Sequence, residues 1–206
     1  MQADLFSDGE PVVETFDVPD AEIWLMYGLL SKGAGCTLFD ALHANTPWEQ
    51  DPIQMYGRKL LSPRLTAWYG DPGSEYKYSG VSHCPRRWTP ELSQLKKLVE
   101  AATKTCFNSA LLTLYRDGDD SVGWHSDDEI ELGRCPKIAS VSIGVERSFQ
   151  LKHKSLEGAP RLDLELPAGS LLWMAGECQH AWVHQVPKRR RVHSARINIT
   201  FRCVSV

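Results

Sequence analysis

The chain lacks a long apolar run. None of its hydrophobic stretches approaches the roughly 18 to 20 residues that a helix needs to cross a bilayer. The first ten residues, MQADLFSDGE, are acidic and lack the basic start and apolar stretch of a signal peptide. These absences predict a cytoplasmic protein with no membrane partner.

Paired cysteines are also missing. The six cysteines are scattered along the chain: Cys36, Cys84, Cys106, Cys135, Cys178 and Cys203. Without a C-x-x-C pair they argue against a cysteine zinc site, and they favour reduced thiols inside a cell. We expect most of them to be buried as small hydrophobic side chains.

An excess of positive charge is absent as well. The net charge is −3, so the whole chain gives no polycation signal for nucleic acid. Two local basic clusters exist, at 188–191 and at 86–87. On charge alone, each cluster is interpreted as a solvated loop. The alternative is that it contacts the phosphate backbone of a nucleic acid. There is no repeat and no low-complexity linker, so residues 1–206 are expected to form a single domain.

Two helices are predicted in the first half of the chain. Residues 31–44 carry Leu38 and Leu42 at helical spacing, and Pro47 ends that helix. A second helix follows Trp88, because Thr89 is a good N-cap and Pro90 suits the first helical position. Its apolar stripe predicts packing on a sheet.

From residue 107 onward, short strand-like runs replace the helical pattern. They are residues 110–115, 138–144, 148–153, 163–167, 169–174, 180–186 and 195–203, separated by turn signals. Many short strands without alternating helices predict an antiparallel sandwich, barrel or jelly roll. The predicted class is therefore α+β, with helices in the N-terminal half and a β core in the C-terminal half.

The segment GWHSDDE (123–129) places His125 and Asp127 two residues apart, and His184 follows 57 residues beyond Asp127. Two histidines and one carboxylate form the facial triad of non-haem Fe(II) oxygenases, which leaves coordination positions open for a co-substrate and O2. With seven histidines and 26 acidic residues, such a pattern can also arise by chance from surface polar groups.

The last predicted strand, RINITFR (196–202), alternates strictly. Period two puts Arg196, Asn198, Thr200 and Arg202 on one face and the apolar residues on the other. Guanidinium groups bind carboxylates through two parallel hydrogen bonds, so this face suits a small dianion. A half-exposed strand with solvated arginines is the alternative.

Together, H-x-D, the distal histidine and R-x-N-x-T-x-R resemble the AlkB family of Fe(II)/2-oxoglutarate dioxygenases. Further similar stretches are PRLTAWYGD (63–71), EYKYSG (75–80), LYRDGDDSVGWHSDDE (114–129), IASVSIGVERSFQLKHK (138–154) and LPAGSLLWM (166–174). The resemblance covers roughly residues 45 to 203, and it is strongest for the branch that contains human AlkB homologue 2, a duplex-DNA dealkylase. It implies a double-stranded β-helix (jelly roll) core at about 107–206. Helices and a nucleotide-recognition lid would lie within about 25–105.

The resemblance implies a set of cofactor ligands. His125, Asp127 and His184 would bind Fe(II), and the reaction would use 2-oxoglutarate as co-substrate together with O2.

The same resemblance implies a co-substrate pocket. Arg196 would pair with the distal carboxylate of 2-oxoglutarate, assisted by Tyr115. Thr113 stands where the family often has asparagine, and its hydroxyl can still donate a hydrogen bond over a shorter reach. Arg202 and Asn198 would hold the end of 2-oxoglutarate nearer the metal.

Five further residues would contact the nucleic acid. Tyr78 would stack on a flipped base, and Tyr76 and Glu129 would hydrogen-bond near its edge. Tyr56 would be the intercalating residue of a finger that wedges into the duplex. Arg64 would lie near the opened base pair. Without the resemblance, these residues would be ordinary strand and turn residues.

The activity implied is direct-reversal repair of alkylated DNA. A monomer would remove alkyl groups from bases such as 1-methyladenine and 3-methylcytosine, with release of succinate and formaldehyde. One alternative is an AlkB-like demethylase of RNA or protein. Another is a non-catalytic nucleic-acid-binding relative, which the presence of all three predicted iron ligands disfavours.

Overall fold

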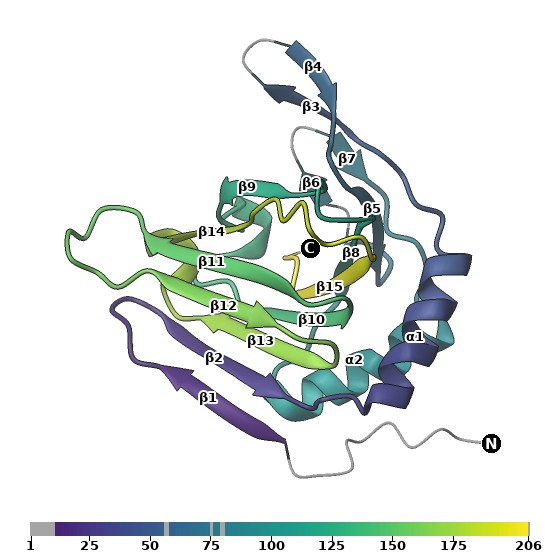
Figure 1. Cartoon of the computed structure of the whole chain (residues 1–206), viewed down its shortest axis with the longest axis horizontal. Coiled ribbons are helices and arrows are strands. Elements are labelled where there is room, and N and C mark those ends of the chain that lie inside the picture. The colour runs from purple at the N-terminus through teal and green to yellow at the C-terminus, as the bar shows by residue number, and fades with distance from the viewer. Residues whose placement is uncertain (1–10, 56–57, 75, 79–80, 206) are drawn as a thin grey trace.

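Two antiparallel sheets form the body of the molecule (Figure 1). The computed structural model describes residues 11–55, 58–74, 76–78 and 81–205, without the side chains of residues 53–59 and 75–83. Apolar side chains from both sheets pack into one core between them, which makes the fold a jelly roll. The expected fold class is thus confirmed.

The larger sheet has the strand order β1-β2-β13-β10-β15-β8-β5. Its strands are β1 (Val12–Phe16), β2 (Glu22–Tyr27), β5 (Leu65–Gly70), β8 (Ser109–Tyr115), β10 (Ile138–Gly144), β13 (Ser170–Ala175) and β15 (Arg196–Arg202). The sheet includes β1, β2 and β5 from the N-terminal half, where the apolar periodicity predicted only helices.

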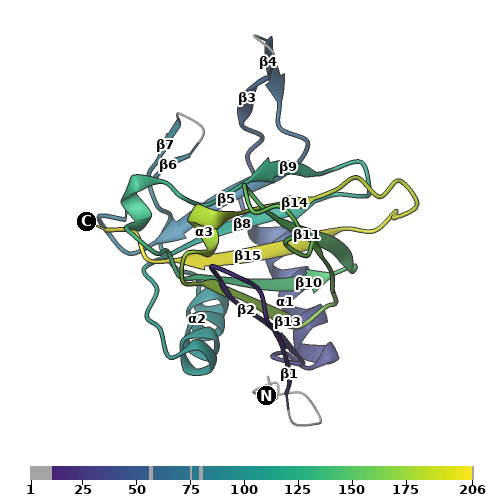
Figure 2. The same cartoon turned by 90° about the vertical axis from the view of Figure 1, so that its left-hand side faces the viewer.

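The smaller sheet has the order β12-β11-β14-β9. Its strands are β9 (Val122–His125), β11 (Arg147–His153), β12 (Leu162–Leu166) and β14 (Trp182–Val186). Two hairpins, β3 (Pro52–Met55) with β4 (Arg58–Leu61) and β6 (Tyr76–Tyr78) with β7 (Val81–His83), project from one end of the body (Figure 2).

Two helices cover the outer face of the larger sheet (Figure 2). Helix α1 (Lys32–Asn45) begins after Ser31, whose side chain accepts a hydrogen bond from the Ala34 amide. Helix α2 (Pro90–Thr103) begins after Thr89, whose hydroxyl caps the Leu92 amide. Both predicted helices are therefore confirmed. The 3₁₀ turn η1 (Ile130–Leu132) and the short α3 (Cys178–Ala181) flank the site described below.

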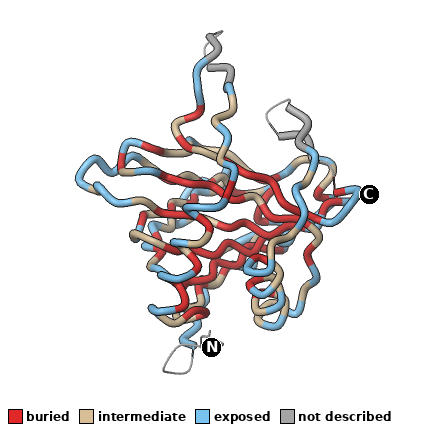
Figure 3. Tube along the Cα trace, turned by 90° about the vertical axis from the view of Figure 1, so that its right-hand side faces the viewer, coloured by how far each residue is buried: buried red, intermediate tan, exposed pale blue. Residues whose placement is uncertain are grey.

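Strand β15 lies at the centre of the larger sheet, between β10 and β8. Its Ile197, Ile199 and Phe201 pack with α1 and α2 in the outer core. The alternate residues Arg196 and Arg202 therefore face the smaller sheet, where only 1% and 3% of their surfaces are exposed. Figure 3 shows that the central strands are buried along most of their length. The alternative of solvated arginines is excluded.

Two expectations from the sequence were wrong. Of the six cysteines, all with free thiols, only Cys178 is buried, because the others lie in loops or on the outer side of a helix. The predicted strand 180–186 begins only at Trp182, because His180 belongs to α3. Among the described residues, no helix is both long and apolar enough to cross a membrane.

Two loops at one end of the jelly roll are joined to each other. Loop 116–121 links β8 to β9, and loop 187–195 links β14 to β15. The Gly118 amide donates to the Val192 carbonyl at 2.8 Å, and the Arg189 amide donates to the Gly118 carbonyl at 2.7 Å. A Cβ at position 118 would collide with the Arg189 carbonyl, so only glycine permits this close approach.

We expect Gly118→Ala to lower the free energy of unfolding by about 1–3 kcal/mol, the usual cost of forcing extra volume into a packed contact. Urea unfolding measures this change. Gly33→Ala is the control, because open space surrounds that helical position and its stability should stay the same or rise slightly. Equal stabilities of the two variants would contradict the tight contact between the loops.

Candidate metal centre

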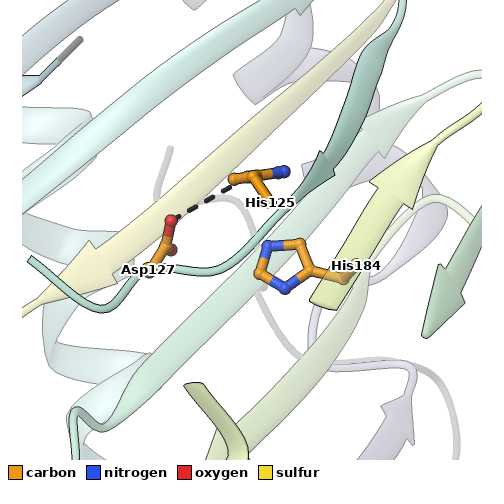
Figure 4. A group of neighbouring side chains, drawn as sticks. All are labelled: His125, Asp127 and His184. Atoms are coloured by element: carbon orange, nitrogen blue, oxygen red, sulfur yellow. Dashed lines mark ion pairs between the residues drawn. The ribbon is translucent and has the colours of Figure 1, made fainter. Parts of the chain in front are cut away.

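Strand pairing brings two histidines together. His125, the last residue of β9, lies opposite His184 of β14, and the centres of their rings are 4.3 Å apart. Asp127 lies in the loop segment 126–129 that follows β9, and its carboxylate points toward the same place (Figure 4). One ligand atom from each of these residues lies within 4.8 Å of the other two. The cluster could therefore hold a metal ion.

The Asp127 carboxylate is fixed by contacts across the core. Its Oδ2 accepts hydrogen bonds from Arg202 at 2.7 Å (Nη2) and 3.2 Å (Nε), and its backbone amide donates to the Gln179 side chain at 3.0 Å. Burial raises the pKa of Asp127, but Arg202 and the neighbouring histidines outweigh that effect and lower it to about 2. The carboxylate is thus ionised at neutral pH.

The two imidazoles are suited to donate lone pairs. Burial, followed by the nearby His125, lowers the pKa of His184 to about 3, so this ring is neutral at pH 7. Its ring packs on Phe149, with centroids 5.1 Å apart. His125 Nδ1 lies 2.9 Å from the Gly123 carbonyl. Since a carbonyl only accepts, Nδ1 carries the proton, and Nε2 is left to bind a metal.

The candidate co-substrate residues lie further along the same inner wall. In the pairing of β15 with β8, Arg196 lies opposite Tyr115 and Asn198 opposite Thr113. Arg196 Nη2 donates to Ser142 and to Asn198, both at 2.8 Å. Burial lowers the pKa of Arg196 to about 10, against the opposing influence of Tyr115. The guanidinium therefore remains charged at pH 7.

Several buried polar atoms indicate what this wall could bind. Within the described residues, Asp127 Oδ1 has no hydrogen-bond partner, nor do Nε and Nη1 of Arg196. Buried polar groups normally have partners, so these atoms can accept a cation at one end and an anion at the other. Two imidazoles and a carboxylate suit Fe(II), and guanidinium suits a carboxylate. The residues thus fit both iron and 2-oxoglutarate.

A cavity between the sheets contains most of the predicted site. Its lining includes the three candidate metal ligands and six further predicted residues: Arg64, Thr113, Tyr115, Arg196, Asn198 and Arg202. Arg64 is buried, and its Nη1 donates to the Ser121 carbonyl at 3.2 Å.

The predicted base-contacting residues are placed less completely. Glu129 is half-buried just before η1. Tyr76 and Tyr78 form the ends of β6, but their side chains are outside the described part of the chain. Tyr56 lies outside the described residues altogether.

The sequence reasoning missed Gln179, Phe149 and Arg147. Gln179 is fully buried and holds the Asp127 amide, yet it stands in a short helix that no pattern predicted. The roles of Phe149 and Arg147 could have been predicted from the alternation of residues along their strand. Period two places them with Leu151 on one face of the strand, and an arginine on an apolar face is unusual.

A jelly roll whose inner wall carries two histidines and a carboxylate has the fold and ligand set of non-haem iron oxygenases. The family model of the 2OG-Fe(II) oxygenase superfamily matches residues 22–202. The chain belongs to that superfamily.

Named relatives refine the resemblance. The chain is 39% identical over 192 residues to alpha-ketoglutarate-dependent dioxygenase alkB homolog 3 of Bos taurus, covering 89% of this chain and 66% of that one. It is 41% identical over 175 residues to the Homo sapiens alkB homolog 3, covering 81% and 60%. It is 38% identical over 194 residues to the DNA oxidative demethylase ALKBH2 of Arabidopsis thaliana, covering 82% and 62%.

These comparisons confirm the resemblance to AlkB-type dioxygenases, with the homolog 3 and ALKBH2 names at nearly equal identity. The chain spans 60–66% of the length of the relatives named above. The solved structure of OsALKBH1 superimposes with a TM-score of 0.67, covering 93% of this chain and 100% of that one. At 14% identity, that likeness supports the jelly-roll fold alone.

We expect His125→Ala to weaken Fe(II) or Mn(II) binding by roughly 100-fold or more, since losing even an outer-shell partner of a metal ligand costs about 10- to 100-fold. Anaerobic calorimetry measures the affinity. The control is His180→Ala, an exposed histidine on α3. The metal assignment is wrong if both variants bind the metal as tightly as the unmodified protein.

Arg202→Met should leave the Asp127 carboxylate buried without its ion-pair partner. In the metal-free protein we expect the free energy of unfolding at pH 7 to fall by about 3–5 kcal/mol. The native Asp127 pKa, about 2, is below the ordinary value of 3.8. Its stabilising contribution is thus full above about pH 4 and is lost as the pH falls through 2. In the variant, burial raises that pKa, so the deficit should shrink from pH 7 toward pH 4.

Urea unfolding at several pH values checks this expectation. Arg189→Met is the control, because Arg189 and Glu165 form an ion pair that is about half exposed. It should cost less than about 1 kcal/mol. A deficit for Arg202→Met that stays constant between pH 7 and pH 4 would contradict the role of Asp127 ionisation.

Proposed function

We propose that the protein is an Fe(II)/2-oxoglutarate-dependent dioxygenase that removes N-alkyl groups from nucleic-acid bases, with alkylated DNA as its substrate. The observation that carries the proposal is the cluster of His125, Asp127 and His184 on the inner wall of a jelly roll, with Arg196 buried on the same wall. The names of the relatives, which include a DNA oxidative demethylase, favour DNA as the substrate.

Iron, O2 and 2-oxoglutarate would supply the oxidising chemistry, in which 2-oxoglutarate becomes succinate and the hydroxylated alkyl group leaves as formaldehyde. The protein residues would hold these groups in place. The two imidazoles and the Asp127 carboxylate would bind the metal on one side, leaving the cavity side open. Arg196 would bind the distal carboxylate of 2-oxoglutarate, with Tyr115 and Thr113 beside it. Arg202 and Asn198 would lie nearer the metal.

Arg202 would have a second role in this arrangement. It already holds Asp127 Oδ2, which leaves Oδ1 as the carboxylate oxygen available to the metal. The ion pair therefore selects which oxygen binds and fixes its direction. The two carboxylate oxygens of Asp127 keep these separate roles because the side chains of Arg202 and Asp127 are both tightly buried.

A base in a nucleic-acid duplex would have to leave its stack of neighbouring bases to reach this cavity, because the candidate ligands lie between two sheets of the protein. The two hairpins project from the end of the body and could form the recognition lid (Figure 2). Exposed Leu60 and Leu61 on β4 give one hairpin an apolar surface suited to unstacked bases. Tyr56 as the wedge, and Tyr76, Tyr78 and Glu129 as base contacts, remain part of this proposal, with Arg64 near the opened pair.

The basic run 188–191 could contact phosphates. It lies in the loop that joins the His184 strand to the Arg196 strand. Arg189 pairs with Glu165 at 2.6 Å, so phosphate would compete with an internal carboxylate there. Such contacts would add affinity without sequence preference, and they would weaken as salt rises.

The test is a dealkylation assay with Fe(II), 2-oxoglutarate and ascorbate. One oligonucleotide that carries 1-methyladenine or 3-methylcytosine is compared as a single strand and as a duplex, and mass spectrometry measures the repaired base. We expect repair by the unmodified protein and none by His125→Ala, since that variant lacks a metal ligand. A greater loss on duplex than on single strands in Tyr56→Ala would support the wedge.

Other outcomes separate the alternatives. Conversion of 2-oxoglutarate to succinate without base repair would mean that the substrate is wrong, and RNA or protein would be tested next. If folded, iron-loaded protein catalyses neither reaction, the result would favour the non-catalytic nucleic-acid-binding alternative.

A further inference from the structure

Arg147 is a buried cation that the proposed reaction does not use. It begins β11, and only 1% of its surface is exposed. Burial lowers the pKa of this guanidinium, which reflects the cost of removing a charge from water. A buried charge is normally kept where it makes specific contacts, so its surroundings decide its role.

The contacts of Arg147 join two loops. Its Nη1 donates to the Asp117 carbonyl at 2.8 Å, and its Nη2 donates to the carbonyls of Asp120 at 2.9 Å and Pro187 at 2.8 Å. The first two carbonyls belong to loop 116–121 and the third to loop 187–195. These loops connect the strand of Tyr115 to that of His125, and the strand of His184 to that of Arg196. One guanidinium thus holds the ends of four strands that carry the candidate site.

The same guanidinium faces Tyr115. Its central carbon is 5.5 Å from the centre of the Tyr115 ring, and that of Arg196 is 5.3 Å from the same ring. Two guanidinium groups therefore lie over the ring of Tyr115, whose hydroxyl is a candidate ligand of 2-oxoglutarate. Such contacts favour a fixed ring orientation. Arg147 also lowers the pKa of Arg196, so the two positive charges sense each other.

Asp120 and Asp117 act on the charge of Arg147 from nearby, but within the described residues Arg147 forms no ion pair with either of them. Asp127 pairs with Arg202, and Asp120 pairs with Arg116 through Nε at 2.8 Å and Nη2 at 2.8 Å. An anion placed against Arg196 would therefore gain from two buried positive charges. In a cavity of low dielectric this gain is larger than in water.

We propose that Arg147 is a positioning residue for the distal carboxylate of the co-substrate, which orients Tyr115 and adds positive potential beside Arg196. It would make the pocket prefer a 2-oxo dicarboxylate to a 2-oxo monocarboxylate. The inference rests on the proposed function insofar as 2-oxoglutarate is the co-substrate, but it does not depend on which macromolecule is dealkylated.

The test measures equilibrium binding to the anaerobic, Fe(II)-loaded protein by calorimetry. The ligands are 2-oxoglutarate and 2-oxopentanoate, in which a methyl group replaces the distal carboxylate. Arg147→Met should weaken 2-oxoglutarate binding by about 10- to 30-fold, the value of the hydrogen bond from the Tyr115 hydroxyl to the distal carboxylate that Arg147 is proposed to position. The affinity for 2-oxopentanoate should change less than about twofold. Arg147→Lys keeps the charge but loses the fork, so its effect should be smaller.

Arg116→Met is the matched control. Arg116 stands in loop 116–121, which Arg147 also contacts, and its side chain is about half exposed in its pair with Asp120. Neither Arg116 nor Arg147 is among the residues that line the cavity, so the two variants differ in burial and not in direct access to the ligand. Both ligands should bind this variant as they bind the unmodified protein. Thermal unfolding of each variant separates loss of fold from loss of affinity.

A double-mutant cycle with Tyr115→Phe tests whether Arg147 acts through the tyrosine. We expect Arg147→Lys to cost less 2-oxoglutarate affinity in the Tyr115→Phe background than alone. Additive effects, or equal losses for both ligands, would overturn the positioning role. If Arg147→Met does not fold, the lysine variant and its cycle decide the matter.

Failure of the inference and failure of the proposed function give different results. If the unmodified protein binds 2-oxoglutarate while the Arg147 variants keep the same preference for 2-oxoglutarate over 2-oxopentanoate, that result would refute the inference alone. An unmodified protein that does not bind 2-oxoglutarate would refute the proposed function. Normal binding without base repair would leave the inference intact and change only the substrate.

Discussion

The buried ion pair between Asp127 and Arg202 ties the two halves of the site together. Arg202 ends β15 in the larger sheet, and Asp127 follows β9 in the smaller one. Both side chains are almost fully buried, so neither charge can lose its partner without a large cost. The pair therefore fixes the distance between the sheets at the candidate metal site. It also leaves one carboxylate oxygen, Oδ1, without a hydrogen-bond partner among the described residues and available to a metal.

The larger sheet separates structural from chemical residues by strand alternation. Toward the helices, β15 presents Ile197, Ile199 and Phe201, and these belong to a purely hydrophobic core. Toward the smaller sheet it presents Arg196 and Arg202, which are charged and equally buried. Because the helices already close the outer face, the inner face can hold polar groups without exposing the core to water. Arg147 adds a further buried cation from the opposite sheet.

Much of this arrangement was predictable from local sequence. Thr89 and Pro90 marked a helix start, and the alternation in 196–202 assigned two faces to the last strand. Other features were hidden for physical reasons. β1 is an exposed edge strand, and β2, which lies between β1 and β13, is apolar at five consecutive positions, so its sequence does not alternate although its burial does. Gln179 serves Asp127 from a segment 52 residues away, a contact that only the folded chain creates. The local sequence gave no sign that most of the cysteines are exposed, because the exposure of a side chain depends on how the neighbouring loops fold around it.

The sequence by itself determined the chemistry that this protein could carry: H-x-D, a distal histidine and two arginines on one strand face, together with the family they resemble. Residue identity and period two were sufficient for that. Only the tertiary structure decided that the arginines are buried rather than solvated, and that His125 lies opposite His184. Both facts depend on which strands pair and what covers each sheet. These are long-range choices, made by burial of apolar surface over the whole chain, and no local pattern encodes them.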